Sequence, residues 1–293
     1  MPDLPTPELR GLPRIISLAN QKGGVGKTTT AVNLATALAA AGQRVLLIDL
    51  DPQSNASTSL GIERAKLGRG AYAALTGQTR LRETILQNVL PGLDLVPSSS
   101  DLAGAEIELA GVDEREFRLR ACLNAPLRAA LLPYAYVFVD CPPSLGLLTV
   151  NALVAADAVL VPLQCEFFAL EGLSQLMRTI EAIRRNLNPR LALEGIVLTM
   201  HDKRNNLSEL VAADARNAFG GQVYDAVIPR NVRISEAPSH GKPILLYDWR
   251  SPGSQAYVKL AAEMLRRERA ASREAPEGVG QGARQGVDRS VVA

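Results

Sequence analysis

The chain has 293 residues, 47% of them hydrophobic, a formal net charge of +2 and three cysteines, and these values exclude several classes of protein. The length suits one large α/β domain or two small ones, and the absence of any run of 18 apolar residues argues against a membrane span. The N-terminus is proline-rich and lacks the apolar centre of a signal peptide. Cys122, Cys141 and Cys165 are odd in number and widely spaced, which favours a reduced cytoplasmic protein over a disulfide framework or a C-x-x-C metal site.

Apolar runs and helical spacings divide the chain into a predicted order of elements. Residues 1–13 have no periodicity and are predicted to be a flexible arm. Short aliphatic runs predict buried strands, and apolar residues at helical spacing predict helices between them. Residues 60–130 are predicted to be mostly helical and polar, and residues 271–293 to form a disordered tail. The predicted strands are 14–20, 44–51, 93–99, 136–141, 158–163 and 195–200, and the predicted helices are 28–42, 170–187 and 254–270.

Strands made of nearly continuous aliphatic runs are typical of a sheet buried on both faces. Such strands alternating with helices predict a doubly wound, mostly parallel sheet flanked by helices, which is an α/β fold. We therefore expect one domain over residues 14–270.

A glycine-rich stretch, NQKGGVGKTTT at residues 20–30, follows the first predicted strand and opens the first predicted helix. The phosphate-binding loop has the pattern G-x-x-x-x-G-K-[ST], and this chain has Gln21 in place of its first glycine and an additional Lys22. Backbone N–H groups and the helix dipole of such a loop favour phosphate. Lys27 is placed for the β- and γ-phosphates, and the Thr28 hydroxyl for Mg²⁺.

The letters K-G-G-V-G-K-T-T resemble the deviant Walker A loop of the ParA/MinD ATPases, which are P-loop NTPases. The resemblance implies ATP and Mg²⁺ as ligands. It also implies that Lys22 reaches across a dimer interface to the partner's ATP, whereas Lys27 serves its own nucleotide; the alternative for Lys22 is a solvated loop lysine. The loop residues expected to hold the nucleotide are Lys22, Gly23, Gly24, Val25, Gly26, Lys27, Thr28 and Thr29.

Two aspartates, Asp49 and Asp51, end the second predicted strand and lie on one face of it by alternation. The resemblance implies that Asp51 orients the attacking water and that Asp49 lies near the magnesium shell. The family sequence is usually D-P-Q-G-N, and this chain has Ser54 in place of the glycine. The alternative is that both aspartates cap a strand end.

Asp140 ends a further aliphatic strand in the stretch YVFVDCPPSLG. An aspartate at the end of such a strand is the Walker B pattern, in which the carboxylate holds Mg²⁺ through water. The following D-C-P-P-S-L-G string resembles the switch segment of the same family.

Basic residues are concentrated towards the C-terminus. Residues 1–177 carry 14 Lys/Arg and 17 Asp/Glu, whereas residues 178–293 carry 18 and 13. Two segments, 199–208 and 227–248, resemble the ParA/Soj partition branch, in which arginines of these segments contact DNA without sequence preference. The resemblance implies DNA contacts by Arg204 and Arg233, with Lys203 and Lys242 as further candidates. The alternative is that the arginines form surface ion pairs with Asp202 or Glu236. Within the second segment, Pro229 and Asn231 are expected beside the adenine.

The resemblance covers about residues 14–268 and implies a DNA-segregation ATPase that is cytoplasmic and nucleoid-associated. It implies that ATP binding forms a homodimer and that the dimer binds double-stranded DNA nonspecifically. A centromere-binding partner of the ParB type would stimulate slow hydrolysis and release the dimer.

Three other classes share parts of the pattern. A MinD-like membrane-associated positioning ATPase needs a C-terminal amphipathic helix with a bulky apolar face, whereas the last predicted helix ends in RRERA, so no membrane partner is expected. A reductase of the nitrogenase-iron-protein type needs cysteines for an iron–sulfur cluster, and the cysteines here lack that context. A small-molecule kinase or ligase with the same loop needs neither Lys22 nor the two basic segments.

Overall fold

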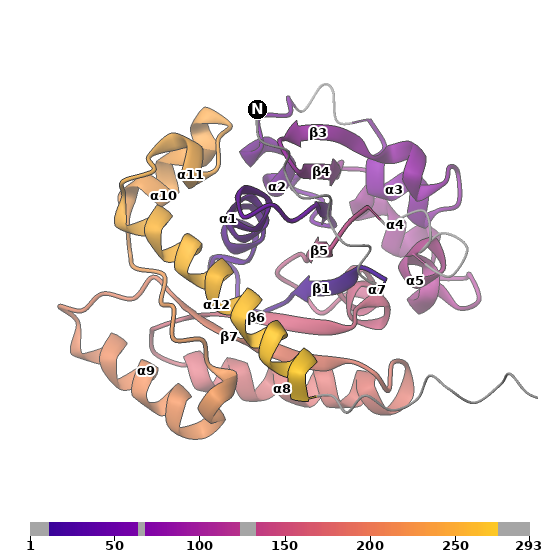
Figure 1. Cartoon of the computed structure of the whole chain (residues 1–293). Helices are drawn as coiled ribbons and strands as arrows, with labels where there is room; N and C mark the ends of the chain where they lie inside the picture. The colour runs from indigo at the N-terminus through magenta and orange to yellow at the C-terminus, as the bar shows by residue number, and fades with distance from the viewer. Residues whose placement is uncertain (1–11, 64–67, 124–132, 275–293) are drawn as a thin grey trace, which may run out of the picture.

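The structure is a computed structural model and describes residues 12–63, 68–123 and 133–274. Seven strands form one sheet in the order β3-β4-β2-β5-β1-β6-β7, and all neighbours are parallel except the antiparallel pair β3 and β4 (Figure 1). The strands are β1 (Arg14–Leu18), β2 (Val45–Asp49), β3 (Leu86–Leu90), β4 (Leu93–Val96), β5 (Tyr136–Asp140), β6 (Ala158–Gln164) and β7 (Ala192–Thr199).

Both faces of the sheet are buried, because alternate residues of each central strand enter different apolar clusters. In β2, Leu46 and Ile48 join one cluster, whereas Val45 and Leu47 join the other. Helices cover both clusters (Figure 1). One layer contains α1 (Lys27–Ala40), α2 (Asn55–Ser59), α10 (Val232–Glu236), α11 (Ile244–Tyr247) and α12 (Pro252–Glu274). The other contains α3 (Gly70–Leu75), α4 (Leu102–Glu108), α5 (Arg118–Leu123), α7 (Leu147–Ala155), α8 (Ala169–Asn186) and α9 (Asn206–Phe219). Short 3₁₀ helices occur at Leu81–Thr84, Arg115–Phe117, Gly220–Gln222 and Ala237–His240.

The predicted doubly wound, mostly parallel α/β fold is confirmed, with differences at its margins. The antiparallel edge strand β3 was not expected, because its residues are half-exposed and give no continuous apolar run. The last helix continues to Glu274, four residues beyond the expected end at 270, because its charged final turns still carry good helix formers. Residues 1–11 of the expected arm and 275–293 of the expected tail lie outside the described residues.

The carboxyl ends of the parallel strands bring several loops to one edge of the sheet. In open α/β sheets this edge is where ligands bind. The segments that follow β1, β2, β5, β6 and β7 are 19–26, 50–54, 141–146, 165–168 and 200–205. All three aspartates and both loop lysines predicted as site residues lie in these segments or directly beside them.

Gly195 of β7 is a backbone position where the fold tolerates no side chain. Its φ of +153° and a register irregularity of β7 against β6 mark a distorted strand. A Cβ added there would lie 2.6 Å from a ring carbon of the buried Tyr224 and 2.8 Å from the carbonyl oxygen of Gln222. Glycine is therefore needed here both for conformation and for space.

Gly195→Ala is expected to lower the free energy of unfolding by about 2–4 kcal/mol, because it combines backbone strain with overpacking against Tyr224. Urea unfolding followed by circular dichroism measures this loss. Gly172→Ala in α8 is the matched control, since apart from its chain neighbours and the backbone of its own helix no described atom lies within 4 Å of the added Cβ. Gly172→Ala should raise the free energy of unfolding slightly. A Gly195→Ala protein as stable as the parent protein would contradict the prediction.

Candidate functional site

The glycine-rich loop lies between β1 and α1, at the carboxyl edge of the sheet. Gly24 and Gly26 have φ values of 75° and 88°, and Gly26 is the N-cap of α1 in the left-handed conformation. These two glycines turn the chain so that the loop meets the N-terminal end of a 14-residue helix. The loop therefore has the strand–turn–helix context that a phosphate site requires.

Lys27, the first residue of α1, is a buried cation whose hydrogen-bond partner among the described residues is a neutral carbonyl. Its side chain is 6% exposed, and Nζ donates to the carbonyl oxygen of Lys22 at 3.1 Å. Burial lowers the pKa of Lys27, and the carboxylates of Asp140 and Asp51 oppose this effect. A buried ammonium that donates to a neutral carbonyl is stabilised when an anion replaces that carbonyl, because hydrogen bonds between opposite charges are stronger. This arrangement makes the loop an anion site.

Asp140 has the carboxylate best suited to a metal shell. It pairs in register with Asp49 across β5 and β2, and it is fully buried. Within the described residues, neither of its carboxylate oxygens has a hydrogen-bond partner. Burial and the neighbouring Asp49 raise the pKa of Asp140 well above the usual range, while the nearby side chain of Thr28 lowers it. Two buried oxygens without partners beside Thr28 fit a magnesium shell.

Asp49 lies beside Asp140, as expected for a residue near a metal shell, but protein donors engage its oxygens. Oδ2 accepts from the hydroxyl and the amide of Ser57 at 2.7 and 2.9 Å, and Oδ1 accepts from the amide of Asp51 at 3.2 Å. Burial raises the pKa of Asp49 to about 6, and the bonds from Ser57 limit the rise. Its direct effect in the structure is to hold the turn that carries Asp51.

Asp51 is 5% exposed and begins that turn. Its Oδ1 accepts from the amide of Gln53 at 2.9 Å, while its carbonyl oxygen accepts from the amide of Ser54 at 2.8 Å and from the hydroxyl of Ser98. Ser54 has φ of 58°, the left-handed conformation that the glycine of the family sequence adopts without strain. The substitution noted in the sequence therefore leaves the turn intact.

The described residues contain no group of three or more His, Cys, Asp and Glu arranged to hold a metal by themselves. Mg²⁺ usually keeps several waters and binds through one or two protein oxygens together with phosphates. Thr28 and Asp140 supply such a minimal set.

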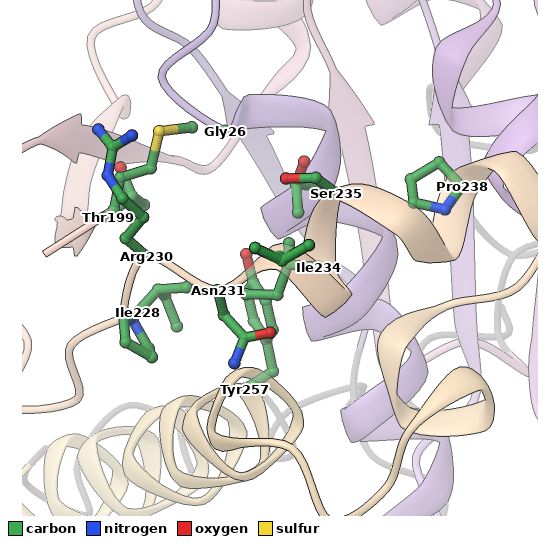
Figure 2. A pocket seen from close by; sticks show the side chains of 13 residues that line it. Gly26, Thr199, Ile228, Arg230, Asn231, Ile234, Ser235, Pro238 and Tyr257 are labelled. Carbon is green, nitrogen blue, oxygen red and sulfur yellow. The ribbon is translucent and has the colours of Figure 1, made fainter. Parts of the chain in front are cut away.

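A cavity of about 430 Å³ adjoins the glycine loop (Figure 2). Gly26 and Thr29 form its side towards the loop, and Pro229 and Asn231, both expected beside an adenine, line it as well. Asn231 also caps α10, since its side chain accepts from the amide of Arg233. The lining residues are Gly26, Thr29, Thr199, Met200, Ile228, Pro229, Arg230, Asn231, Val232, Ile234, Ser235, Pro238 and Tyr257.

Several residues that line this pocket were not predicted from the sequence. Thr199 ends β7 and donates its hydroxyl to the carbonyl oxygen of Val25, which ties β7 to the glycine loop. Tyr257 comes from α12, more than 50 positions away from Thr199, and its hydroxyl lies 3.4 Å from that of Thr30. The position of Thr199 at the carboxyl end of a strand is a signal that could have found it; no local signal marks Tyr257.

The side chain of Lys22 is paired with a residue of a neighbouring loop. Its ammonium pairs with Glu166, which follows β6, and the side chain is 47% exposed. Two exposed aromatic residues, Phe167 and Phe168, follow Glu166 and contact each other with ring centroids 4.2 Å apart. Lys22 therefore lies at the surface, and its ammonium is paired.

The predicted basic residues are exposed, and the two arginines form the surface ion pairs considered as the alternative. Arg204 binds Asp202 through two nitrogens at 2.9 and 3.0 Å and lowers the pKa of that carboxyl to about 2. Arg233 binds Glu236 at 2.9 Å and approaches Asp248 at 3.6 Å. Lys203 and Lys242 are exposed and form no ion pair in the part of the chain that the structure describes. Exposed ion pairs are weak, so these arginines can exchange partners.

Cys122, Cys141 and Cys165 are free thiols in the structure, and Cys141 and Cys165 are buried. Among residues 12–63, 68–123 and 133–274, no helix has both the length and the apolar character needed to cross a membrane.

A mostly parallel sheet with a lysine-bearing glycine loop at its carboxyl edge defines a P-loop ATPase. The AAA domain family matches residues 13–193, more than half of the chain. The chromosome partitioning protein ParA of Caulobacter vibrioides is 62% identical over 256 residues, which cover 87% of this chain and 95% of that protein. The sporulation initiation inhibitor protein Soj of Bacillus subtilis is 51% identical, with 86% and 98% covered. The chain belongs to the ParA/Soj family of partitioning ATPases.

A solved structure supports the same fold. Cobyrinic acid a,c-diamide synthase from Mycobacterium smegmatis, with a bound ATP analog and magnesium, matches with a TM-score of 0.76 and 37% identity. The match covers 89% of this chain and 97% of that one. The 37% identity to this synthase is lower than the 62% identity to the chromosome partitioning protein.

Proposed function

We propose that this protein is a DNA-segregation ATPase whose ATP-bound homodimer binds double-stranded DNA without sequence preference. The observation that carries the nucleotide part is the buried Lys27 ammonium, which donates to a carbonyl, together with the Asp140 carboxylate, which has no hydrogen-bond partner among the described residues. The relatives named as chromosome partitioning proteins support the cellular role. The two basic segments supply the DNA-binding surface.

The loop and its neighbours have separate tasks in hydrolysis. The amides of residues 23–29 and the ammonium of Lys27 bind the phosphates, and the pocket with Pro229 and Asn231 takes the adenine. Thr28 and Asp140 would hold Mg²⁺, with Asp49 supporting the turn beside them, and the bound ion would neutralise charge on the phosphates. Asp51 orients the attacking water. Lys22 of a second copy stabilises charge on the γ-phosphate.

The cycle follows from these tasks. ATP joins two copies because each triphosphate attracts the other copy's Lys22. The dimer then binds DNA phosphates through Arg204 and Arg233, with Lys203 and Lys242 adding affinity. A ParB-type partner stimulates hydrolysis, and the protein leaves the DNA. This cycle takes place in the cytoplasm on the nucleoid.

Co-sedimentation with double-stranded DNA tests the proposal. Retention is expected with ATP and Mg²⁺ and should be lost with ADP or without nucleotide. It should also weaken steeply with salt, because each neutralised phosphate adds about −0.9 to the slope of log K against log salt. Retention on liposomes and not on DNA would instead favour the membrane-associated class.

Arg233→Glu is expected to reduce DNA retention by about tenfold or more while ATP-dependent dimers still form. The change removes a phosphate contact and introduces repulsion, but the backbone amide of residue 233 keeps its bond to Asn231. Arg185→Glu is the matched control, since Arg185 also pairs with a glutamate on a helix surface but lies on α8. Equal retention of the two variants at physiological salt would show that the DNA surface lies elsewhere.

A further inference from the structure

The ammonium of Lys22 is held on its own protomer by a carboxylate that is itself positioned. Glu166 pairs with it through Oε1, and its Oε2 accepts from the side-chain amide of Gln164 at 2.6 Å. The backbone amide of Glu166 also donates to the carbonyl oxygen of Gln164 at 2.9 Å. Glu166 is therefore fixed to the end of β6 by two hydrogen bonds with Gln164, and its position does not depend on that of the glycine loop.

The backbone of Lys22 is engaged on both sides. Its amide donates to Oδ1 of Asn20 at 3.0 Å, and its carbonyl oxygen accepts from Nζ of Lys27 at 3.1 Å. Asn20 in turn donates to the carbonyl oxygen of Pro162 in β6 at 2.8 Å. Lys27, which would bind the protomer's own phosphates, thus donates to Lys22, which would bind the phosphates of a second copy.

We propose that Glu166 is a positioning residue that keeps Lys22 on its own protomer until the triphosphate of a second copy displaces it; this inference rests on the proposed ATP-bound dimer. An ammonium paired with Glu166 is not available to a triphosphate on a second copy. When phosphates enter the loop, Lys27 moves its hydrogen bond from the carbonyl of Lys22 to the phosphates. The Glu166 pair then remains as the contact that the second copy's triphosphate must displace.

The pair is exposed enough to be displaced. The side chains of Lys22 and Glu166 are 47% and 34% exposed. An exposed ion pair of this kind shifts an equilibrium by about two- to fivefold. A dimer must release two such pairs, so removing the carboxylate should tighten dimerisation by about 4- to 25-fold. ATP binding to the protomer should not change, because among the described residues Glu166 forms hydrogen bonds and ion pairs with no residue of the loop other than Lys22.

The test measures the dimer dissociation constant by analytical ultracentrifugation at saturating ATP and Mg²⁺. Glu166→Gln and Glu166→Ala are made in an Asp51→Ala background, so that turnover does not disturb the equilibrium. Both should tighten the dimer while ATP affinity of the monomer and thermal melting stay unchanged. Glu171→Gln, an equivalent change in the first turn of α8, is the control and should leave the dimer as in the background protein.

The outcomes separate this inference from the function on which it rests. If the background protein itself stays monomeric with ATP, the proposed dimer fails. If that protein dimerises and the two Glu166 variants dimerise equally well or less well, the positioning role of Glu166 is wrong. A tighter dimer in both variants, with Glu171→Gln unchanged, supports it.

Discussion

Lys22→Ala is expected to abolish ATP-dependent dimerisation, raising the dimer dissociation constant at least about 30-fold, while ATP binding to the monomer stays within about twofold. Removing one partner of a charge pair that is buried in an interface costs far more than removing an exposed pair. ATP binding should persist, because alanine keeps the carbonyl oxygen that accepts from Lys27. Light scattering measures the dimer, and a fluorescent ATP analogue measures binding.

The control for this variant is Lys27→Ala, which removes the buried ammonium from the loop. That protein should lose ATP binding itself, and with it every later step. If Lys22→Ala forms dimers at ATP concentrations that are sufficient for dimerisation of the parent protein, the proposed role of Lys22 across the interface is wrong.

Asp51→Ala should lower ATP turnover by about a hundredfold and prolong the lifetime of the protein on DNA. The loss follows from removing the carboxylate that orients water. The turn itself should survive, because the contacts with Ser54 and Ser98 use the carbonyl oxygen of residue 51 and not its side chain. Phosphate release measures turnover, and dissociation from immobilised DNA measures the lifetime.

Asp51→Asn is the matched variant, since an amide oxygen can still accept from Gln53 but carries no charge. It should be as slow as Asp51→Ala if the charge is what matters. Turnover at the parent rate in Asp51→Ala would exclude the proposed role of Asp51, whereas turnover at the parent rate in Asp51→Asn alone would show that the oxygen and not the charge is needed.

The loop and the two acidic strand ends could be predicted because their signals are local. An aliphatic strand followed by glycines, a lysine and a threonine forces a strand–turn–helix unit, whatever the rest of the chain does. Asp49 and Asp140 were each predicted from a single strand end. Their pairing across β2 and β5 depends on register, which a one-dimensional pattern does not contain.

The different fates of Asp49 and Asp140 illustrate what local signals miss. Both end apolar strands and both are fully buried. Ser57 and the amide of Asp51 occupy the oxygens of Asp49, whereas those of Asp140 have no partner in the described residues. The sequence pattern treats the two alike, and only the tertiary structure shows that the oxygens of Asp49 accept hydrogen bonds whereas those of Asp140 have no partner among the described residues.

By itself the sequence determined the alternation of strands and helices, the phosphate loop and the positions of its charged residues, because hydrophobic period and glycine conformation act over a few neighbouring residues. Tertiary structure alone decided that Thr199 and Tyr257 share a pocket with that loop, and that Lys22 pairs with Glu166. These contacts join segments far apart in the chain, and the order and register of the parallel strands bring them to one edge of the sheet.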